Sequence, residues 1–367
     1  MPHGSMKGDA MSKIWANSGD SHVMEPDDVW TSRLPAHLAE RAPRTVKDER
    51  HETVYVDGQT VFRTLNAFAE AARAPGARDL SARLADLDAE GVVNQVLFPS
   101  MGLWAYRITD GELWRACASA YNSWMAEEVM SVSDRLVGVA MLPLLSTEDA
   151  VAELQRAADL GFRAAMLATT PPEGRDYNLD VWDDLWAAAA DANLALAFHV
   201  GTGADPRMFR GPGAVVINYV ETFIPGQRTV AILTAAGVLD RHPGLKVFIA
   251  EGGASWVPAL ADRMDEGYRQ HGAFASPKLS RLPSEMIFEQ VYASFQHDRS
   301  AIPAFEAMEY PNVLWGDDYP HLEGTYGHTQ ETLRQLFGAV DPATAERVLV
   351  SNFDRLLGTT TRVPVTA

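Results

Sequence analysis

The chain has 367 residues, 47% hydrophobic and 22% charged, so it can bury a sizeable core and is neither disordered nor fibrous in composition. Its 31 basic and 49 acidic residues give a formal net charge of -18, which excludes a typical nucleic-acid-binding surface and suits a small-molecule substrate. The single cysteine, Cys117, excludes an intrachain disulfide. With no membrane-length apolar run and no signal-peptide pattern, we expect a cytoplasmic protein without a membrane partner.

The chain begins with Met1–Met6, which resembles a leader added for expression, and His3 is therefore left out of the search for functional residues. We expect residues 1–13 to be this leader and a disordered N-terminus. Residues 14–358 should form a single domain, and residues 359–367 a C-terminal tail.

From about Arg78 onward, short apolar runs alternate with longer amphipathic ones, as expected when strands buried on both faces alternate with helices, and Ile14–His22 adds a first strand. The predicted strands are Ile14–His22, Val92–Phe98, Leu136–Leu142, Ala164–Leu167, Leu194–His199, Lys246–Ala250, Val291–Phe295 and Val313–Gly316. The predicted helices include Leu80–Glu90, Glu112–Val132, Thr147–Leu160, Val181–Asp191, Gln227–Leu239, Ser255–His271 and Thr329–Phe337. Strict alternation predicts an α/β fold, a (β/α)8 TIM barrel, and the lack of a Gly-x-Gly-x-x-Gly turn disfavours a nucleotide-binding sheet.

Two stretches interrupt the alternation. Met24–Ala77 is too long for a strand-to-helix loop and contains a hairpin pattern, Thr53–Val56 and Thr60–Arg63, around an Asp-Gly turn. Gly201–Pro225 is rich in glycine and proline. Both leave the ends of predicted strands, where barrel enzymes carry their active sites, so we predict an insertion over the barrel mouth after strand one and a long lid loop.

Side chains that bind metals stand at the ends of several predicted strands. Asp20 and His22 lie two residues apart on the first strand and so face the same way, His199 ends the fifth strand, and Asp318 ends the eighth. Further candidates are Glu251 at the end of the sixth strand, His297 near the end of the seventh, and His321 after the eighth. Because these ends converge at one mouth of a closed barrel, the sequence predicts a metal site there.

Four motifs resemble those of the amidohydrolase superfamily, in particular the branch that includes the aminocarboxymuconate-semialdehyde decarboxylase-like enzymes. They are Asp20–Pro26, Phe198–Gly203, Glu251–Pro258 and Trp315–His321, and the resemblance covers residues 14–358. It implies that Asp20, His22, His199 and Asp318 hold a divalent metal, and it suggests a homodimer.

The chain departs from the family pattern in three ways. Asp20 stands where the family commonly has His or Glu, Phe162–Leu167 offers no lysine for a carboxylated bridge, and Glu251 replaces a histidine. Glu251 and His297 could each be metal ligands or structural hydrogen-bonding groups, and His321 could simply hydrogen-bond the Asp318 loop.

Asp and His ligands suit Zn²⁺, Mn²⁺ or Fe²⁺, as one ion or two, and a metal-bound water can ionise near neutral pH. Asp318 would then take a proton, and Glu251 or His321 would protonate the leaving group. Aromatic and arginine side chains on the loops are expected to bind a carboxylated substrate. These residues are Trp104, Arg107, Arg207, Phe209, Tyr219 and Trp256.

Three functions remain open at this point. The first is hydrolysis of a C–N or C–O bond, or non-oxidative decarboxylation, of a small organic acid. The second is O₂-dependent hydroxylation at a dinuclear non-heme iron site, because the ligand set is large enough for two ions. The third is a non-catalytic scaffold subunit. Metal content distinguishes them.

Overall fold

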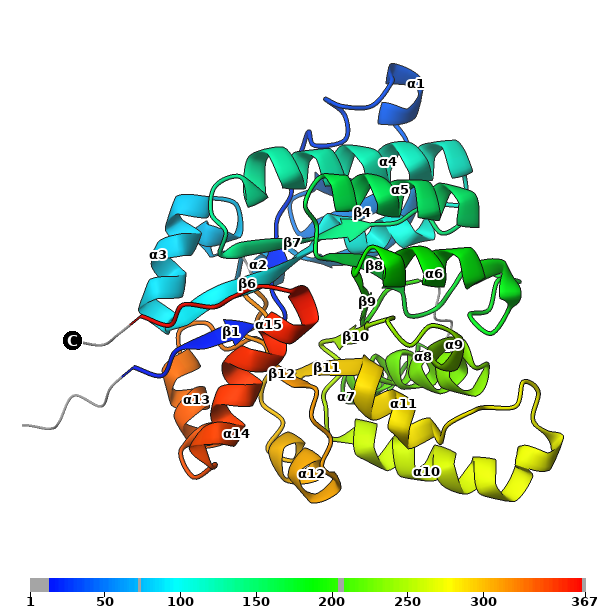
Figure 1. The fold of residues 1–367 in the computed structure, drawn as a ribbon. Coiled ribbons are helices and arrows are strands. Elements are labelled where there is room, and N and C mark those ends of the chain that lie inside the picture. Colours follow the sequence, from blue (N-terminus) through cyan, green and yellow to red (C-terminus); the bar gives the residue numbers. More distant parts are fainter. Residues whose placement is uncertain (1–12, 72–73, 204–207, 365–367) are drawn as a thin grey trace, which may run out of the picture.

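The computed structural model describes residues 13–71, 74–203 and 208–364. Its central sheet is parallel, with strands in the order β1-β6-β7-β8-β9-β10-β11-β12 and the short β2 paired with β6. Figure 1 shows these strands in the middle of the molecule with helices around them. The strands are β1 (Ala16–Ser18), β2 (His22–Val23), β6 (Val92–Pro99), β7 (Leu136–Met141), β8 (Ala164–Ala168), β9 (Ala195–His199), β10 (Val247–Ala250), β11 (Val291–Phe295) and β12 (Val313–Trp315).

The two ends of this sheet meet. Ser21 forms a parallel bridge with Tyr319, and the Asp318 N–H donates to the Asp20 carbonyl oxygen at 2.9 Å. The sheet therefore closes into the (β/α)8 TIM barrel that the sequence predicts. Closure also places the first and last candidate ligands side by side, although almost 300 residues separate them.

The first predicted strand, Ile14–His22, is broken in the structure into β1 and β2. Between them the Ser18 hydroxyl donates to the Asp20 carbonyl oxygen at 2.7 Å, a local contact that competes with the ladder. Gly19 lies so close to Leu314 that an added Cβ would be 3.2 Å from the leucine Cβ. The break turns Asp20 out of the regular strand while keeping it at the barrel mouth.

The predicted helices are present, with shifted ends. The Ser146 hydroxyl caps α5 by accepting from the Asp149 N–H at 3.2 Å. A 3-10 turn, Asp180–Trp182, precedes α6. The helices are α1 (Ala36–Ala39), α2 (Asn66–Ala71), α3 (Leu80–Glu90), α4 (Gly111–Trp124), α5 (Thr147–Asp159), α6 (Asp183–Asp191), α7 (Ala214–Glu221), α8 (Ile224–Ala235), α9 (Val238–Arg241), α10 (Trp256–His271), α11 (Pro283–Gln290), α12 (Ala301–Met308), α13 (Thr329–Phe337), α14 (Pro342–Glu346) and α15 (Asn352–Leu357).

The stretch after the first strand contains a small antiparallel sheet. The predicted hairpin is present as β4 (His51–Val56) and β5 (Gln59–Leu65), joined by Asp57 and Gly58 with φ of 50° and 73°. A third strand that the sequence did not predict, β3 (Arg44–Lys47), pairs with β4. The second irregular stretch is not loop throughout, because it contains α7, a helix with no buried residue.

The core fills the barrel and the space between strands and helices. Every residue of β7, β8, β9, β10 and β11 is buried, and so are Trp114, Trp182, Trp186 and Trp315. Cys117 belongs to this core, where burial raises the pKa of its thiol to about 12, so it behaves as a small apolar side chain. Within the described ranges, no helix is long and apolar enough to cross a membrane.

Candidate metal centre

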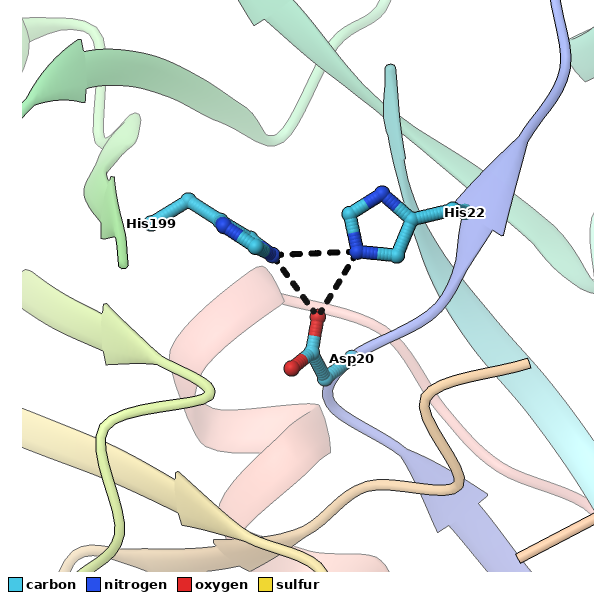
Figure 2. Close-up of side chains that lie close together, drawn as sticks. All are labelled: Asp20, His22 and His199. Atoms are coloured by element: carbon cyan, nitrogen blue, oxygen red, sulfur yellow. Dashed lines mark hydrogen bonds and ion pairs between the residues drawn. The ribbon is translucent and has the colours of Figure 1, made fainter. Parts of the chain in front are cut away.

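Three potential ligands converge at the barrel mouth (Figure 2). Asp20 comes from the segment between β1 and β2, His22 opens β2, and His199 ends β9. The Nε2 atoms of the two imidazoles lie 3.1 Å apart, and Asp20 Oδ1 lies 3.5 Å from His199 Nε2 and 4.0 Å from His22 Nε2. Atoms bound about 2.0–2.2 Å from one ion lie roughly 3–4 Å from each other, so this spacing fits a shared cation.

The hydrogen bonds on the far side of each ring fix where the lone pairs point. Nδ1 of His22 lies 3.0 Å from the Pro99 carbonyl oxygen, and Nδ1 of His199 lies 2.9 Å from that of Val200. A carbonyl only accepts, so each Nδ1 carries a hydrogen and each neutral ring presents an Nε2 lone pair to the other. Burial, with His321 and His199 nearby, holds the pKa of His22 well below its ordinary value. Burial also opposes charge on His199, but Asp20 and Glu251 outweigh it and raise the pKa of that ring.

The carboxylates provide the test of whether a cation fits here. Asp20 and Asp318 are fully buried, and none of their four oxygens accepts a well-aligned hydrogen bond from the described residues. Burial, and then Asp20 and Glu323, raise the pKa of Asp318 well above its ordinary range. Unpaired buried carboxylates are costly unless a cation compensates them, so these residues fit a divalent ion.

Further groups extend the site beyond the first three ligands. His321 Nδ1 lies 3.0 Å from Asp318 Oδ1, and its ring stacks on His22 at 4.1 Å. Glu251 Oε2 lies 3.6 Å from His199 Nε2, and burial followed by Asp318 raises the pKa of Glu251 well above its ordinary value. Glu251, Asp318 and Glu323 form another group whose ligand atoms all lie within 4.8 Å of one another. Glu323 was not predicted, because it follows no strand end and only the fold of the Asp318 loop brings it near.

The structure does not bring His297 into these groups. Its side chain is exposed, its Nε2 lies 3.0 Å from the Glu323 carbonyl oxygen, and its ring stacks on His328 at 5.7 Å. His297 therefore follows a strand end, as the predicted ligands do, but its side chain contacts the neighbouring loop rather than the carboxylates.

Two of the acidic residues adopt an uncommon backbone conformation. Glu251 and Asp318 have φ of 59° and 49°, in the left-handed region that non-glycine residues seldom adopt. Their surroundings hold them there: the Glu251 N–H donates to Ser294 Oγ at 3.0 Å, and the Trp256 indole donates to the Gly252 carbonyl oxygen at 2.9 Å. Such conformations persist where neighbouring contacts over-determine them, and they are concentrated at functional sites.

A buried hydrogen-bond network, which the sequence did not reveal, holds the backbone next to the ligands in place. The fully buried guanidinium of Arg83 donates to the carbonyl oxygens of His22 and Gly76 and to Gln95 Oε1. Gln95 Nε2 in turn donates to Asp317 Oδ2 at 2.6 Å. Burial raises the pKa of Asp317 to about 6. Arg83 thus connects the backbone of one ligand, His22, with the residue that precedes another, Asp318.

Those predicted substrate-binding residues that the structure describes lie on the loops and helices around the mouth. Tyr219, on α7, is half-exposed, and its phenol pKa is raised first by burial and then by Glu251 and Glu323, which places it in the field of the acidic groups. Trp104 stacks on Phe62 of the hairpin at 5.1 Å. Trp256 holds the Glu251 loop as described above. Arg107 and Phe209 are both exposed, and Arg207 lies outside the described residues.

Comparisons with known proteins agree on one family. A family model described as amidohydrolase matches residues 72–359. The decarboxylase orsB of Emericella nidulans is 28% identical over 279 residues, which span 72% of this chain and 80% of that protein. The 2-amino-3-carboxymuconate-6-semialdehyde decarboxylase of Dictyostelium discoideum is 26% identical over 293 residues, which span 76% of this chain and 77% of that protein.

A solved structure gives the same fold. It is the 5-carboxyvanillate decarboxylase of Novosphingobium aromaticivorans, with bound manganese and 3-methoxy-4-hydroxy-5-nitrobenzoic acid. The TM-score is 0.71 at 15% sequence identity, and the match covers 94% of this chain and 97% of that one. At this identity the likeness concerns the barrel and not the chemistry at its mouth.

Proposed function

Because the chain belongs to the amidohydrolase superfamily, in the branch of the aminocarboxymuconate-semialdehyde decarboxylase-like enzymes, we propose that it is a divalent-metal-dependent carboxy-lyase acting on a small organic acid. The observation that carries the proposal is a pair of fully buried carboxylates, Asp20 and Asp318, beside two facing imidazole nitrogens; their oxygens accept no well-aligned hydrogen bond from the described residues. The decarboxylases among the relatives favour this reaction over hydrolysis.

The ligand roles follow from the distances. Asp20, His22, His199 and Asp318 would hold the ion, with Zn²⁺, Mn²⁺ and Fe²⁺ as candidates. A bound ion would polarise a substrate oxygen next to the carboxylate that leaves. His321, 3.0 Å from Asp318 Oδ1, would keep that carboxylate oriented.

Glu251 is the candidate proton donor. Burial and Asp318 raise the pKa of Glu251, so its carboxyl group takes up a proton more readily than an ordinary glutamate does. A bound ion alone favours the ionised form, and the negative charge of the bound substrate would return the proton to Glu251. That proton would form the new C–H bond at the carbon that carries the carboxylate. The C–C bond to the carboxylate then breaks, its electron pair returns to the carbon framework, and CO₂ leaves; Glu251 recovers its proton from solvent.

The test combines metal analysis with product analysis. Protein purified without added chelator would be analysed for metals, then stripped and reloaded separately with Zn²⁺, Mn²⁺ or Fe²⁺. Each form would be assayed with a panel of carboxylated aromatic and unsaturated acids, with CO₂ release measured in the absence of O₂. We expect metal-dependent CO₂ release in the parent protein and in Glu306→Gln, an exposed change on α12, and its loss in Asp318→Asn. Metal-dependent hydrolysis products without CO₂ would replace the lyase with a hydrolase, in which Asp318 accepts a proton from water.

One observation favours a second candidate, O₂-dependent hydroxylation at a dinuclear iron site. Glu251, Asp318 and Glu323 form a carboxylate group that shares Asp318 with the group containing His22 and His321. Two irons per chain, together with substrate-dependent O₂ uptake in the presence of a reductant, would select this function. If the chain neither contains metal nor takes it up, both enzymatic proposals fail and a scaffold role remains.

A further inference from the structure

A cavity that contains none of the metal-binding residues lies on another part of the barrel mouth. It has a volume of about 500 Å³, between the β4–β5 hairpin and the loops that follow β6, β7 and β8, and we call it the lateral cavity. Much of its wall is apolar, including Val61, Tyr106, Ile108, Leu144 and Leu145. Its size falls within the roughly 300–1,000 Å³ of small-molecule sites.

Two arginines in the wall have no carboxylate partner. Arg107 and Arg175 both line the cavity, as does the exposed Glu173, but neither arginine forms an ion pair in the described part of the chain. Arg175 is held in place by Trp182, over whose ring its guanidinium lies at 4.7 Å, and by Thr147, whose hydroxyl accepts from it at 2.6 Å. Its buried Nε still lacks a hydrogen-bond partner among the described residues. In a chain with a net charge of -18, two such arginines around one apolar cavity indicate a binding site for an anion.

The wall of this cavity and the metal site include the ends of two neighbouring strands, β8 and β9. Ala168 lines the cavity and is the register partner of His199 in the neighbouring strand. The next residue, Thr169, donates its N–H to Thr202 Oγ1 at 2.9 Å, and that hydroxyl donates to the His199 carbonyl oxygen at 2.6 Å. Thr170 also lines the cavity, and its buried hydroxyl has no partner in the part of the chain that is described.

We propose that the lateral cavity binds the distal part of the substrate, an apolar body that ends in an anionic group held by Arg107 and Arg175. The substrate is then an amphiphilic acid that extends beyond the carbon at the metal site. The identification of the bound molecule as the substrate rests on the proposed function. The prediction that the cavity binds an apolar anion does not depend on that function.

The test uses a matched pair of probes on the full-length protein, 4-biphenylcarboxylate and its neutral analogue 4-biphenylmethanol, by isothermal titration calorimetry. We expect the carboxylate to bind roughly tenfold more tightly or better, because charge-assisted hydrogen bonds to guanidinium groups exceed those to a neutral hydroxyl. Arg107→Gln and Arg175→Gln should each remove most of this preference. Arg263→Gln, at an exposed α10 arginine that pairs with Glu266, is the matched control and should change nothing.

Two further variants separate the cavity from the metal site. Val61→Trp, on β5, fills the cavity and should weaken binding of both probes, with a thermal melt to confirm folding. Asp318→Asn should leave probe binding intact even if no decarboxylation is ever detected, so failure of the proposed function is distinguishable from failure of the cavity. Equal binding of the two probes, unchanged binding in both arginine variants, or binding lost only in Asp318→Asn would each overturn the proposal.

Discussion

The two sides of the barrel mouth differ in which kind of buried polar group lacks a hydrogen-bond partner. On the side formed by β1, β2, β9, β10 and β12, the buried groups without a well-aligned hydrogen bond among the described residues include all four carboxylate oxygens of Asp20 and Asp318. On the side above β6, β7 and β8, they include the Nε donor of Arg175, in the partly apolar wall of the lateral cavity. A cation compensates a buried carboxylate that lacks donors, and an anion suits a guanidinium with a donor that lacks an acceptor, so the first side suits a metal and the second an organic acid.

The two sides also differ in how they are supported. The ligands rest on the buried Arg83 network, so a change there should affect folding and metal binding together. The lateral cavity is formed by loops and a hairpin with exposed side chains such as Phe62, where changes should alter ligand affinity without altering metal binding. The following predictions test that contrast.

The largest effect is expected for Asp318→Asn. Metal affinity should fall roughly 100-fold or more, because the amide removes the charge that a cation compensates. The metal-free variant should melt at about the same temperature as the metal-free parent, because burial and Asp20 raise the pKa of Asp318 and so already disfavour its charge there. Differential scanning calorimetry with and without Mn²⁺ checks both parts. A variant that retains full metal content would refute the ligand assignment.

Arg83→Met should combine a stability loss with a binding loss. Three buried acceptors, on Gly76, His22 and Gln95, would lose their donor, so the free energy of unfolding should fall by about 3–5 kcal/mol. Metal affinity should fall roughly 10- to 100-fold, as is typical when residues behind the ligands are removed. Urea denaturation of the metal-free protein and metal titration measure the two effects. Arg83→Lys, which keeps the charge but not the fork of donors, should be intermediate.

Glu251→Gln should change the number of protons released on metal binding more than it changes the affinity for the metal. The pKa of Glu251 is raised in the metal-free protein, so its carboxyl group is protonated there, and a bound cation favours the ionised form. Metal affinity should therefore rise with pH through the range of this raised pKa. Calorimetry in buffers of different ionisation enthalpy should show about one proton fewer released by the variant. An unchanged number of released protons would show that Glu251 does not lose a proton when the ion binds.

The smallest effect is expected for Phe62→Ala in the hairpin. Its ring stacks on Trp104 at 5.1 Å, but it is 43% exposed and does not line the lateral cavity. Its loss should lower the free energy of unfolding by about 1 kcal/mol and the affinity of the cavity for 4-biphenylcarboxylate by roughly fivefold at most. Metal content should not change. Val46→Ala, at a similarly exposed apolar position on β3, is the control. A loss of metal in Phe62→Ala would contradict the separation of the two sides.

Much of the barrel could be predicted because strands such as β7 and β8 are uniformly apolar, a pattern that depends only on burial of both faces. The break between β1 and β2 could not, because it depends on the Ser18 hydroxyl and on the close approach of Leu314 to Gly19. Nor could β3, whose residues are all exposed and therefore carry no hydrophobic period.

The candidate site, like the fold, could be predicted only in part. Asp20, His22, His199 and Asp318 were predicted from their positions at strand ends, and the structure brings them together; their roles as ligands stay a proposal. His297 stands near a strand end as well, yet its ring contacts the Glu323 loop instead of the carboxylates.

The sequence by itself determined the parallel barrel and the strand ends at which reactive side chains would stand, because both follow from local hydrophobic periodicity and from the topology it imposes. Only the tertiary structure decided which polar groups are left without partners. Glu323, Arg83 and Arg175 are recognisable only when the burial and the neighbours of each atom are known. Satisfaction of a buried charge is a property of the whole surrounding packing, which no local pattern in the chain encodes.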